Sequence, residues 1–380
     1  MTAKTNTYTL RENSTGKIFN LSLNDKVLIS TQGKPDKLKT TEKAFPSVEE
    51  ASRQALKKAW ELLKKGYVLK NDQPAAGEAG LHYFVGSGYT GSLAFEHTPD
   101  GIYVYKHGHF NNPTDQQDFM VRIDTEGNLL ETILLPKILA WDMQYSPISN
   151  LLLLDLDHYI FEYTLSGKTF RQLIKGENGR TSFISIRGGK TAFATRETLF
   201  LTDPQNNVLL EQEYTIETIM GSIPFCARLS KSGEQMAFYH KEGEIELISS
   251  KDGQIIRKIT GDFERVDQME FAHEDQLLII RALYGSRGLR YFDLSTGQEQ
   301  AFESLEIPEY SKEVKAFCLN NDQSRLVLLQ RTRAYVYDFK QKKLLYSFAI
   351  DHCVKTAKIK FIGDLLGVRT DYGCFSLYAI

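Results

Sequence analysis

The segment that decides the fold is MAFYHKEGEIELISSKDGQII, residues Met236–Ile256. It contains short apolar-rich runs separated by the turn around Gly243 and by the turn SSKDG, a pattern that predicts consecutive antiparallel β-strands. Two further segments follow the same plan, LVLLQRTRAYVYDFKQKKLL (Leu326–Leu345) and LLLDLDHYIFEYTLSGKTF (Leu152–Phe170). The sequence therefore predicts a repeating unit made of strands.

Two independent registers give the length and the number of these units. The turn before the last strand of a unit recurs every 40 to 46 residues, at Gly127, Gly167, Asn207, Gly253, Gly297 and Lys342. The strand that opens a unit recurs every 41 to 50 residues, at Phe95, Tyr145, Ile186, Leu229, Phe271, Leu319 and Phe361. Four short strands in a unit of this length are typical of one propeller blade. We therefore predict a mainly β chain with a seven-bladed β-propeller over residues 81–380.

The two ends of the repeat region are complementary. The last unit stops after its third strand, at Cys374–Ile380, and an unassigned strand, Leu81–Val85 (LHYFV), precedes the first unit. Pairing these two strands would close the ring and cover an otherwise open sheet edge. We expect Leu81–Val85 to be the outer strand of the seventh blade.

The repeat region resembles the WD40-like propeller superfamily over about 300 residues. An aspartate ends the predicted third strand of four units, at Asp124, Asp203, Asp293 and Asp338. The tryptophan of the family's dipeptide is missing at these positions, and Trp141-Asp142 lies at the start of a first strand instead. The resemblance therefore concerns architecture and implies a platform for binding other proteins.

Residues 1–70 form a different unit. Three strand-like runs, TYTLRE, KIFNLSL and KVLIS, precede a lysine-rich loop and one amphipathic helix. Ser47 and Glu50 form a capping box at the start of this helix, and Gly66 is a natural C-cap. We predict a small α+β domain.

This unit resembles the WGR domain, a module of poly(ADP-ribose) polymerases and many bacterial proteins, over about 65 residues. The resemblance is carried by FNLSLNDKVLIS, by KAFPSVEEASRQALKKAWELLKKGYV and above all by the closing LKKGY. Gln32-Gly33-Lys34 stands where the family has Trp-Gly-Arg, a motif that helps it to contact nucleic acid or a neighbouring domain. The absence of a stacking tryptophan and a bidentate arginine weighs against DNA-end binding.

Charge is divided unequally between the two parts. Residues 1–70 hold 14 Lys and Arg against 7 Asp and Glu, whereas the remainder holds 32 against 41. A basic small domain is thus joined to an acidic large one. The candidate surface for an anionic partner consists of Gln32, Gly33, Lys34, Lys37 and Lys39. The alternative is an ordinary solvated loop next to a solvated helix face.

The loops suggest a second candidate surface. Insertions at Lys106–Asp118 in the first blade and Leu283–Gly288 in the fifth follow the second strand in both blades, so they emerge on one rim. The loops at 176–180 and 218–224 are expected on the same face, and the alternative is neutral variation in loop length. The candidate partner-binding residues of this face are His107, His109, Phe110, Asn112, Arg180, Tyr284 and Arg287.

Catalytic and cofactor motifs are weakly represented. Gly86-x-Gly88-x-x-Gly91 leads into a strand, whereas a dinucleotide-binding motif opens a helix. His107-Gly108-His109 lacks further ligands nearby in sequence, so we expect no metal, no cofactor and no catalytic residue. Residues 71–80 are predicted to be a linker that is either loose or pinned, and its Ala, Gly and Pro content favours a hinge.

The four cysteines, at 226, 318, 353 and 374, show no C-x-x-C spacing and are expected to be buried and reduced. With no secretory signal and no long apolar run, a cytoplasmic monomer without membrane contact is the expectation. The leading hypothesis is a non-catalytic adaptor for an unidentified protein partner. Two alternatives stay open, a nucleic-acid-associated factor acting through the lysines and a propeller hydrolase or lyase with a site in the central channel.

Overall fold

The structure is a computed structural model. It describes residues 7–86, 92–108, 116–157, 159–173, 182–195, 197–215, 226–285, 288–300, 314–350, 352 and 356–380, with side chains omitted at 182–184 and 284–285. In these ranges the chain is almost entirely β-strand, with one helix, α1 (Val48–Leu63). This helix is too short and too polar to cross a membrane, and the described ranges contain no other candidate.

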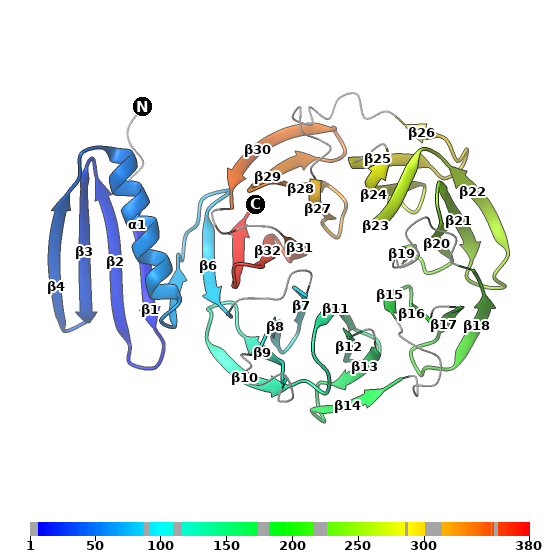
Figure 1. Ribbon diagram of the computed structural model, residues 1–380, viewed down its shortest axis with the longest axis horizontal. Helices are drawn as coiled ribbons and strands as arrows, with labels where there is room; N and C mark the ends of the chain where they lie inside the picture. The colour runs from blue at the N-terminus through cyan, green and yellow to red at the C-terminus, as the bar shows by residue number, and fades with distance from the viewer. Residues whose placement is uncertain are drawn as a thin grey trace.

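Six separate four-stranded antiparallel sheets stand around a ring, as Figure 1 shows. Their strands are β7–β10 (Phe95–Thr98, Gly101–Lys106, Phe119–Ile123, Leu129–Leu134), β11–β14 (Ala140–Ser146, Leu151–Leu156, Tyr159–Thr164, Thr169–Gln172), β15–β18 (Ser182–Arg187, Lys190–Ala194, Thr198–Thr202, Val208–Glu213), β19–β22 (Cys226–Leu229, Gln235–Lys241, Glu244–Ser249, Ile255–Thr260), β23–β26 (Phe263–Ala272, Leu277–Gly285, Gly288–Asp293, Glu299–Gln300) and β27–β30 (Val314–Leu319, Arg325–Gln330, Arg333–Asp338, Lys343–Ala349).

The repeat predicted from the sequence is confirmed strand by strand. All seven positions of the opening register lie in the first strand of a group, from Phe95 in β7 to Phe361 in β31 (Ala357–Ile362). The turns before the fourth strands are held by the aspartates at the ends of the third strands. Asp203 shows how, because its Oδ1 accepts the backbone N–H groups of Gln205 and Asn207 at 2.9 and 2.8 Å.

The number of separate blades is six, not the seven expected. The remaining strands belong to a nine-stranded sheet in the order β31-β32-β33-β6-β5-β1-β2-β3-β4. Its other members are β32 (Leu365–Thr370), β33 (Cys374–Ala379), β6 (Ala79–Phe84), β5 (Tyr67–Lys70), β1 (Thr7–Glu12), β2 (Lys17–Asn24), β3 (Val27–Lys34) and β4 (Lys37–Ala44). The outer edge that ends each of the six blades is here continued by the N-terminal unit, since β6 pairs with both β33 and β5.

Strands from opposite ends of the chain meet in this sheet. Leu81 of β6 lies opposite Leu377 of β33, and Phe84 lies opposite Cys374. Leu81, Leu377 and Phe375 are at most 2 % exposed and pack in one apolar cluster with residues of the first blade. The ring is therefore closed by antiparallel pairing and by burial of apolar side chains.

Residues 71–80, whose composition favours a hinge, are held in place by backbone hydrogen bonds. Asn71 N donates to Gly80 O at 2.9 Å, so the segment is a tight connection between β5 and β6. It is also tied to the C-terminal strand, because Gly77 N donates to Ala379 O at 2.8 Å and Ala379 N donates to Glu78 O at 3.0 Å. These bonds fix a segment whose composition alone suggests freedom.

The N-terminal unit (residues 7–70) packs α1 across one face of its sheet. Ala51, Ala55, Ala59 and Leu62 of α1 are buried against Leu10, Phe19 and Leu21 of the strands. The Ser47 side chain accepts from Glu50 N, as the capping box predicts. The lysine-rich loop, however, is not a loop, since residues 37–44 form the strand β4, which pairs with β3 along its whole length.

Candidate functional site

The lysines of the N-terminal unit lie in register on a β-hairpin. Lys34 of β3 is opposite Lys37 of β4, and Gln32 is opposite Lys39. Alternate residues of a strand share a face, so Lys37, Lys39 and Lys43 project to the same side as these partners. This is the side of the sheet that α1 covers, because Leu28, opposite Lys43, is buried with the helix.

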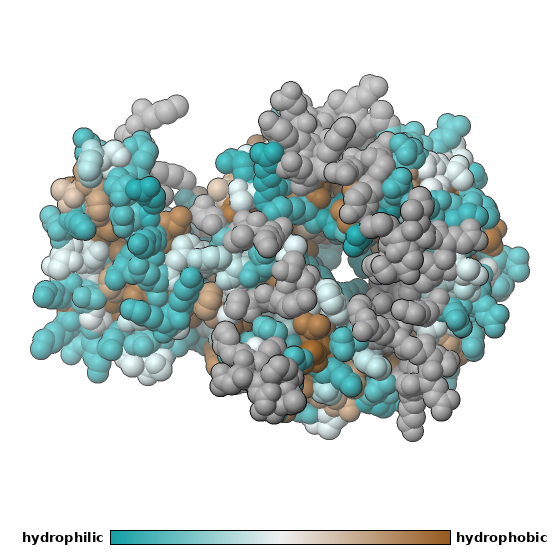
Figure 2. Space-filling model, viewed as in Figure 1, coloured by the Kyte–Doolittle hydropathy of each residue, from teal (hydrophilic) through white to brown (hydrophobic). Residues whose placement is uncertain are grey.

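The helix does not extend over β4. All eight residues of β4 are exposed, and β4 is the last strand of its sheet. Among the described residues, no carboxylate lies within ion-pair distance of Lys34, Lys37 or Lys39. Figure 2 shows that this end of the molecule is largely hydrophilic. The lysine surface, which we define as Lys34, Lys37, Lys39 and Lys43, is thus free to attract an anionic partner.

Gly33, which the sequence places in the candidate surface, has a backbone role. Its φ of +141° lies in a region that side chains rarely adopt, and a Cβ atom there would overlap the Lys37 carbonyl oxygen. Gly33 therefore allows the hairpin to turn between Lys34 and Lys37 and is not itself a binding group.

The second candidate surface lies mostly outside the described residues, as do the loops 176–180 and 218–224. The candidate residues that lie outside the described residues are His109, Phe110, Asn112, Arg180 and Arg287. Tyr284 is described by its backbone only, as part of β24, so the insertion predicted at 283–288 is mainly an extension of β24 and β25. His107 Nδ1 lies 3.2 Å from both Asp118 Oδ1 and the Tyr105 hydroxyl, so its ring is turned towards a fully buried carboxylate.

The first strand of each blade faces the centre of the ring (Figure 1), and an opening is visible there in Figure 2. Charged side chains on these strands form ion pairs across the ring, two of them between adjacent blades (Lys360–Glu96 and Arg228–Glu270) and two reaching past one blade (Lys358–Asp142 and Arg187–Glu270). Burial alone would raise the pKa of Asp142, but Lys358 and Lys360 outweigh it and hold that pKa well below its usual range. The pairs are Lys360–Glu96 at 2.8 Å, Lys358–Asp142, Arg187–Glu270 at 2.5 Å and Arg228–Glu270 at 2.7 Å.

These ion pairs do not resemble a hydrolytic centre. A channel enzyme needs a carboxylate or histidine with a perturbed pKa that is available to a substrate. Here the carboxylates are neutralised by their neighbours, which suits a structural role between blades. No group of three metal-ligating side chains occurs at the channel in the part of the chain that the structure describes.

The junction between the N-terminal unit and the ring is a third candidate site. The ring of Trp60, on α1, lies 5.3 Å from that of His352 and 5.1 Å from that of Tyr372, both with edge-on geometry. Lys64 Nζ donates to the Tyr372 hydroxyl at 3.2 Å. A cavity of about 20 Å³ beside Trp60 and His82 has room for about one water molecule, which is too little for an organic ligand.

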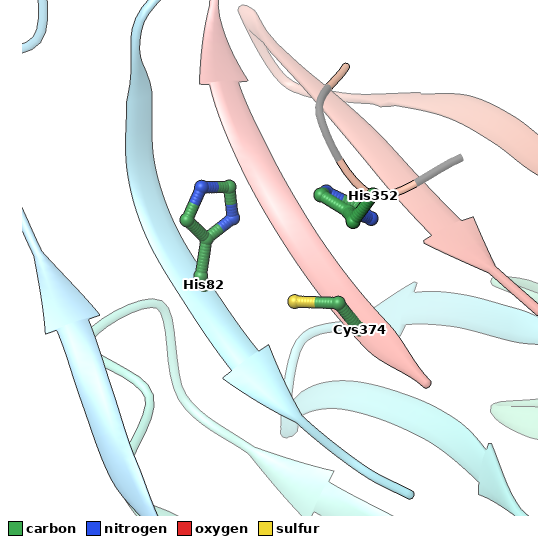
Figure 3. A group of neighbouring side chains, drawn as sticks. All are labelled: His82, His352 and Cys374. Atoms are coloured by element: carbon green, nitrogen blue, oxygen red, sulfur yellow. The ribbon is translucent and has the colours of Figure 1, made fainter. Parts of the chain in front are cut away.

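Behind Trp60, two histidines and a cysteine come together, as Figure 3 shows. One ligand atom from each of His82, His352 and Cys374 lies within 4.8 Å of the other two. The hydroxyl of Ser376 lies between them, 2.6 Å from His82 Nδ1, 3.0 Å from His352 Nε2 and 3.5 Å from Cys374 Sγ. This junction cluster, which we define as His82, His352, Cys374 and Ser376, joins β6, β33 and the segment after β30.

Burial keeps the junction cluster uncharged at neutral pH. It lowers the pKa of His82 to about 4 and raises the pKa of the Cys374 thiol to about 12. The pKa of His352 is also well below its ordinary value, because of burial first and then the nearby His82 and Arg369. The guanidinium of Arg369 is fully buried next to the cluster and donates to the carbonyl oxygens of Thr370 and Gly86.

We expect the stability of the protein to fall in mild acid because of these histidines. Between about pH 4 and 6.5 the unfolded chain binds protons that the folded His82 does not, so stability decreases as the pH falls through this range and is constant above it. Thermal unfolding with EDTA present should give a Tm about 2–6 °C lower at pH 5 than at pH 7. His352→Gln should reduce this slope, while His97→Gln, at an exposed position, should not. An unchanged slope in His352→Gln would contradict the assignment.

Sequence reasoning missed the junction cluster. His82 is in the strand predicted to close the ring, and Cys374 and Ser376 are in its predicted partner. The register of that pairing, which places His82 opposite Ser376, cannot be read from either strand alone. His352 lies in the connection from β30 to β31 and contacts Thr370 and Tyr378 of the sheet that β31 enters, which its sequence position does not reveal.

Comparison with known proteins gives the fold and no family. No protein-family model and no curated protein matches the sequence. Among solved structures, a chain from the crystal structure of the mitotic checkpoint complex superimposes with a TM-score of 0.60 at 10 % identity, covering 82 % of this chain and 94 % of that one. At this identity the similarity shows a shared fold alone, in agreement with the β-propeller arrangement of the sheets.

Proposed function

We propose that this protein is a non-enzymatic interaction scaffold, a seven-bladed propeller with a fixed WGR-like module that binds an acidic, extended protein segment. The observation that carries the proposal is the exposed lysine-bearing edge strand β4. The structural neighbour is part of a multi-protein complex by its title, which is consistent with a scaffolding role for the same fold.

The seven-bladed description is supported by the order β31-β32-β33-β6, which repeats the four-stranded plan of the six separate sheets. Taken as a blade, these strands occupy the remaining position in the ring of Figure 1. The WGR-like description is supported by an antiparallel sheet with one helix packed across it. We place the boundary between the two domains in the connection 71–80.

A scaffold must hold its binding surfaces in fixed relative positions, and the contacts at the junction favour this. Asn13 Nδ2 donates to Gly127 O at 3.0 Å, and Lys70 forms an ion pair with Glu126 in the same turn of the first blade. Val68 of β5 is 3 % exposed and packs in the apolar cluster that contains Leu81 and Phe375. The lysine surface is therefore positioned rigidly with respect to the rim of the propeller.

An extended acidic peptide fits β4 better than nucleic acid does. The free edge of β4 offers backbone groups for an added strand, and three of the four alternate residues on one face, Lys37, Lys39 and Lys43, are lysines. Acidic residues at alternate positions of an added strand would lie opposite them. Nucleic-acid surfaces usually add aromatic or arginine groups for stacking, and the four positions of the lysine surface provide none. Lysines on an edge strand also discourage association between sheets, which is the competing explanation.

The proposal is tested by fluorescence anisotropy with the full chain. The probes are a labelled ten-residue peptide of alternating Glu and Thr, the same peptide with proline at every Thr, and a 20-base-pair duplex, each at low and at physiological salt. We expect the Glu-Thr peptide to bind and the proline peptide to bind at least about 10-fold more weakly, because proline cannot donate to a ladder.

Charge-reversed variants identify the surface. Lys34→Glu, Lys37→Glu and Lys39→Glu together should weaken binding of the peptide by about 100-fold or more. The matched control reverses three exposed lysines of the propeller, Lys251, Lys340 and Lys343, and changes the net charge equally. Steep salt-dependent binding of the duplex instead of the peptide would favour the nucleic-acid alternative. If neither probe binds at low salt, the lysines only protect the edge.

A further inference from the structure

We propose that His82, His352 and Cys374 bind one Zn²⁺ or Cu⁺ ion, which fastens the two ends of the chain where they close the ring. The three side chains come from β6, from the segment after β30 and from the start of β33 (Figure 3). This site is independent of the lysine surface and of the function proposed above.

The donor atoms converge on a single point. Ser376 Oγ occupies that point at 2.6, 3.0 and 3.5 Å from His82 Nδ1, His352 Nε2 and Cys374 Sγ. Metal–nitrogen and metal–sulfur bonds are about 2.0–2.3 Å long, so a bound ion needs the donors to move inward by about 1 Å. Rotation of the Ser376 side chain either vacates the point or leaves its oxygen as a fourth ligand.

The donor set selects the class of metal. Two imidazoles and a thiolate suit Zn²⁺ and Cu⁺, whereas Mg²⁺ and Ca²⁺ prefer sets made of oxygen atoms. Arg369 is buried beside Cys374 and adds a positive charge. A neutral site of Cu⁺, thiolate and two imidazoles tolerates this charge better than the positively charged site that Zn²⁺ forms with the same ligands. The experiment therefore includes both ions.

The surroundings hold one ligand in the required orientation. His352 Nδ1 lies 2.9 Å from Thr370 Oγ1, which can accept the proton of that nitrogen and leave the lone pair of Nε2 directed at Ser376 Oγ and at the Tyr378 hydroxyl, 3.2 Å away, which a metal would have to displace. Partners of this kind orient histidine ligands in metalloproteins. Trp60 covers the cluster from the side of α1, with its ring 6.1 Å from His82.

A metal at this position would link β6, β33 and the segment after β30, so binding would stabilise the closed form over the open one. Binding would also release the proton of the Cys374 thiol, since the thiolate is the ligand.

The experiment uses the reduced, EDTA-stripped full chain. For the Zn²⁺ arm, Co²⁺ is titrated as a spectroscopic probe and then displaced by Zn²⁺. For the Cu⁺ arm, a chromogenic Cu⁺ chelator competes with the protein under anaerobic conditions. We expect one equivalent to bind in at least one arm, with a thiolate-to-metal absorption band, and the thermal midpoint to rise on addition of that metal.

Variants test whether the metal binds at His82, His352 and Cys374 or elsewhere in the protein. Cys374→Ser and His352→Gln should each weaken binding by about 100-fold or more and abolish the thermal shift. Cys318→Ser, in β27, is the matched control and should bind as the parent protein does. Ser376→Ala keeps all three ligands and should still bind the metal. It provides the test if Cys374→Ser proves unstable. The proposal is overturned if the parent protein binds neither ion at micromolar concentration, or if Cys374→Ser binds equally well.

Discussion

A chain that starts at Gly86 is expected not to form the closed ring. Without β6, the strand β33 loses its outer partner, and Phe375 and Leu377 lose the contact with Leu81 that buries them. An open sheet edge next to exposed apolar side chains favours aggregation. We expect a loss of about 5 kcal/mol or more in the free energy of unfolding, or no folded monomer at all. Urea denaturation and size-exclusion chromatography measure this directly.

The matched control is a chain that starts at Asn71. It lacks β1–β5 and α1 but keeps β6, so the pairing with β33 is preserved. It loses the contacts of Val68 and Trp60, and we expect it to fold with reduced stability. If the two truncated chains behaved alike, closure by β6 would not be what holds the ring together.

Gly127→Val is expected to separate the N-terminal unit from the ring. Gly127 has a φ of +77°, and a Cβ atom there would lie 2.6 Å from both Val68 Cγ1 and Leu81 Cδ1. Both neighbours are buried, so neither has room to move aside. We expect a loss of about 3–5 kcal/mol from backbone strain and overpacking together, measured as the shift of the urea midpoint.

Gly363→Val separates the two contributions. Gly363, in the turn between β31 and β32, also has a positive φ, of +57°, but a Cβ atom there meets nothing within 4 Å. We expect about 1–2 kcal/mol from backbone strain alone. The difference in the free energy of unfolding between the two variants measures the packing of the first blade against β5 and β6. Equal losses of stability would show that Gly127 is needed only for the backbone conformation of its turn.

Gly127→Val also bears on the rigid placement of the lysine surface, because this variant keeps β3 and β4. A peptide that contacts β4 and the propeller rim at once gains from a fixed geometry, because less conformational freedom is lost on binding. If the junction is loosened in Gly127→Val, affinity for such a peptide should fall although no lysine has changed.

The repeat could be read from the sequence because it depends on local chemistry. Strand alternation, turn glycines and the aspartates after the third strands act within a few residues, and all seven opening positions are in the expected strands. The helix of the N-terminal unit was equally predictable, since Ser47 and Glu50 form a local cap. Six copies appear as separate sheets, while the last group of strands merges with the N-terminal unit.

The errors arise where a partner strand decides the outcome. Lys37–Ala44 is polar and fully exposed, so nothing in it indicates a strand, and only the ladder to β3 makes it one. Residues 71–80 look flexible, yet Ala379 and Gly80 hold their backbone. In both cases hydrogen bonds formed by residues distant in sequence override local preference.

The repeat, the turns, the capped helix and the division of charge can be read from the sequence, because each of these arises from neighbouring residues. Which strands share a sheet, and with it the attachment of the N-terminal unit to the ring, depends on the folded chain as a whole. The same holds for the meeting of His82, His352 and Cys374. Their proximity depends on closing a ring between the two ends of the chain, and the geometry of a ring is a property of all its blades at once.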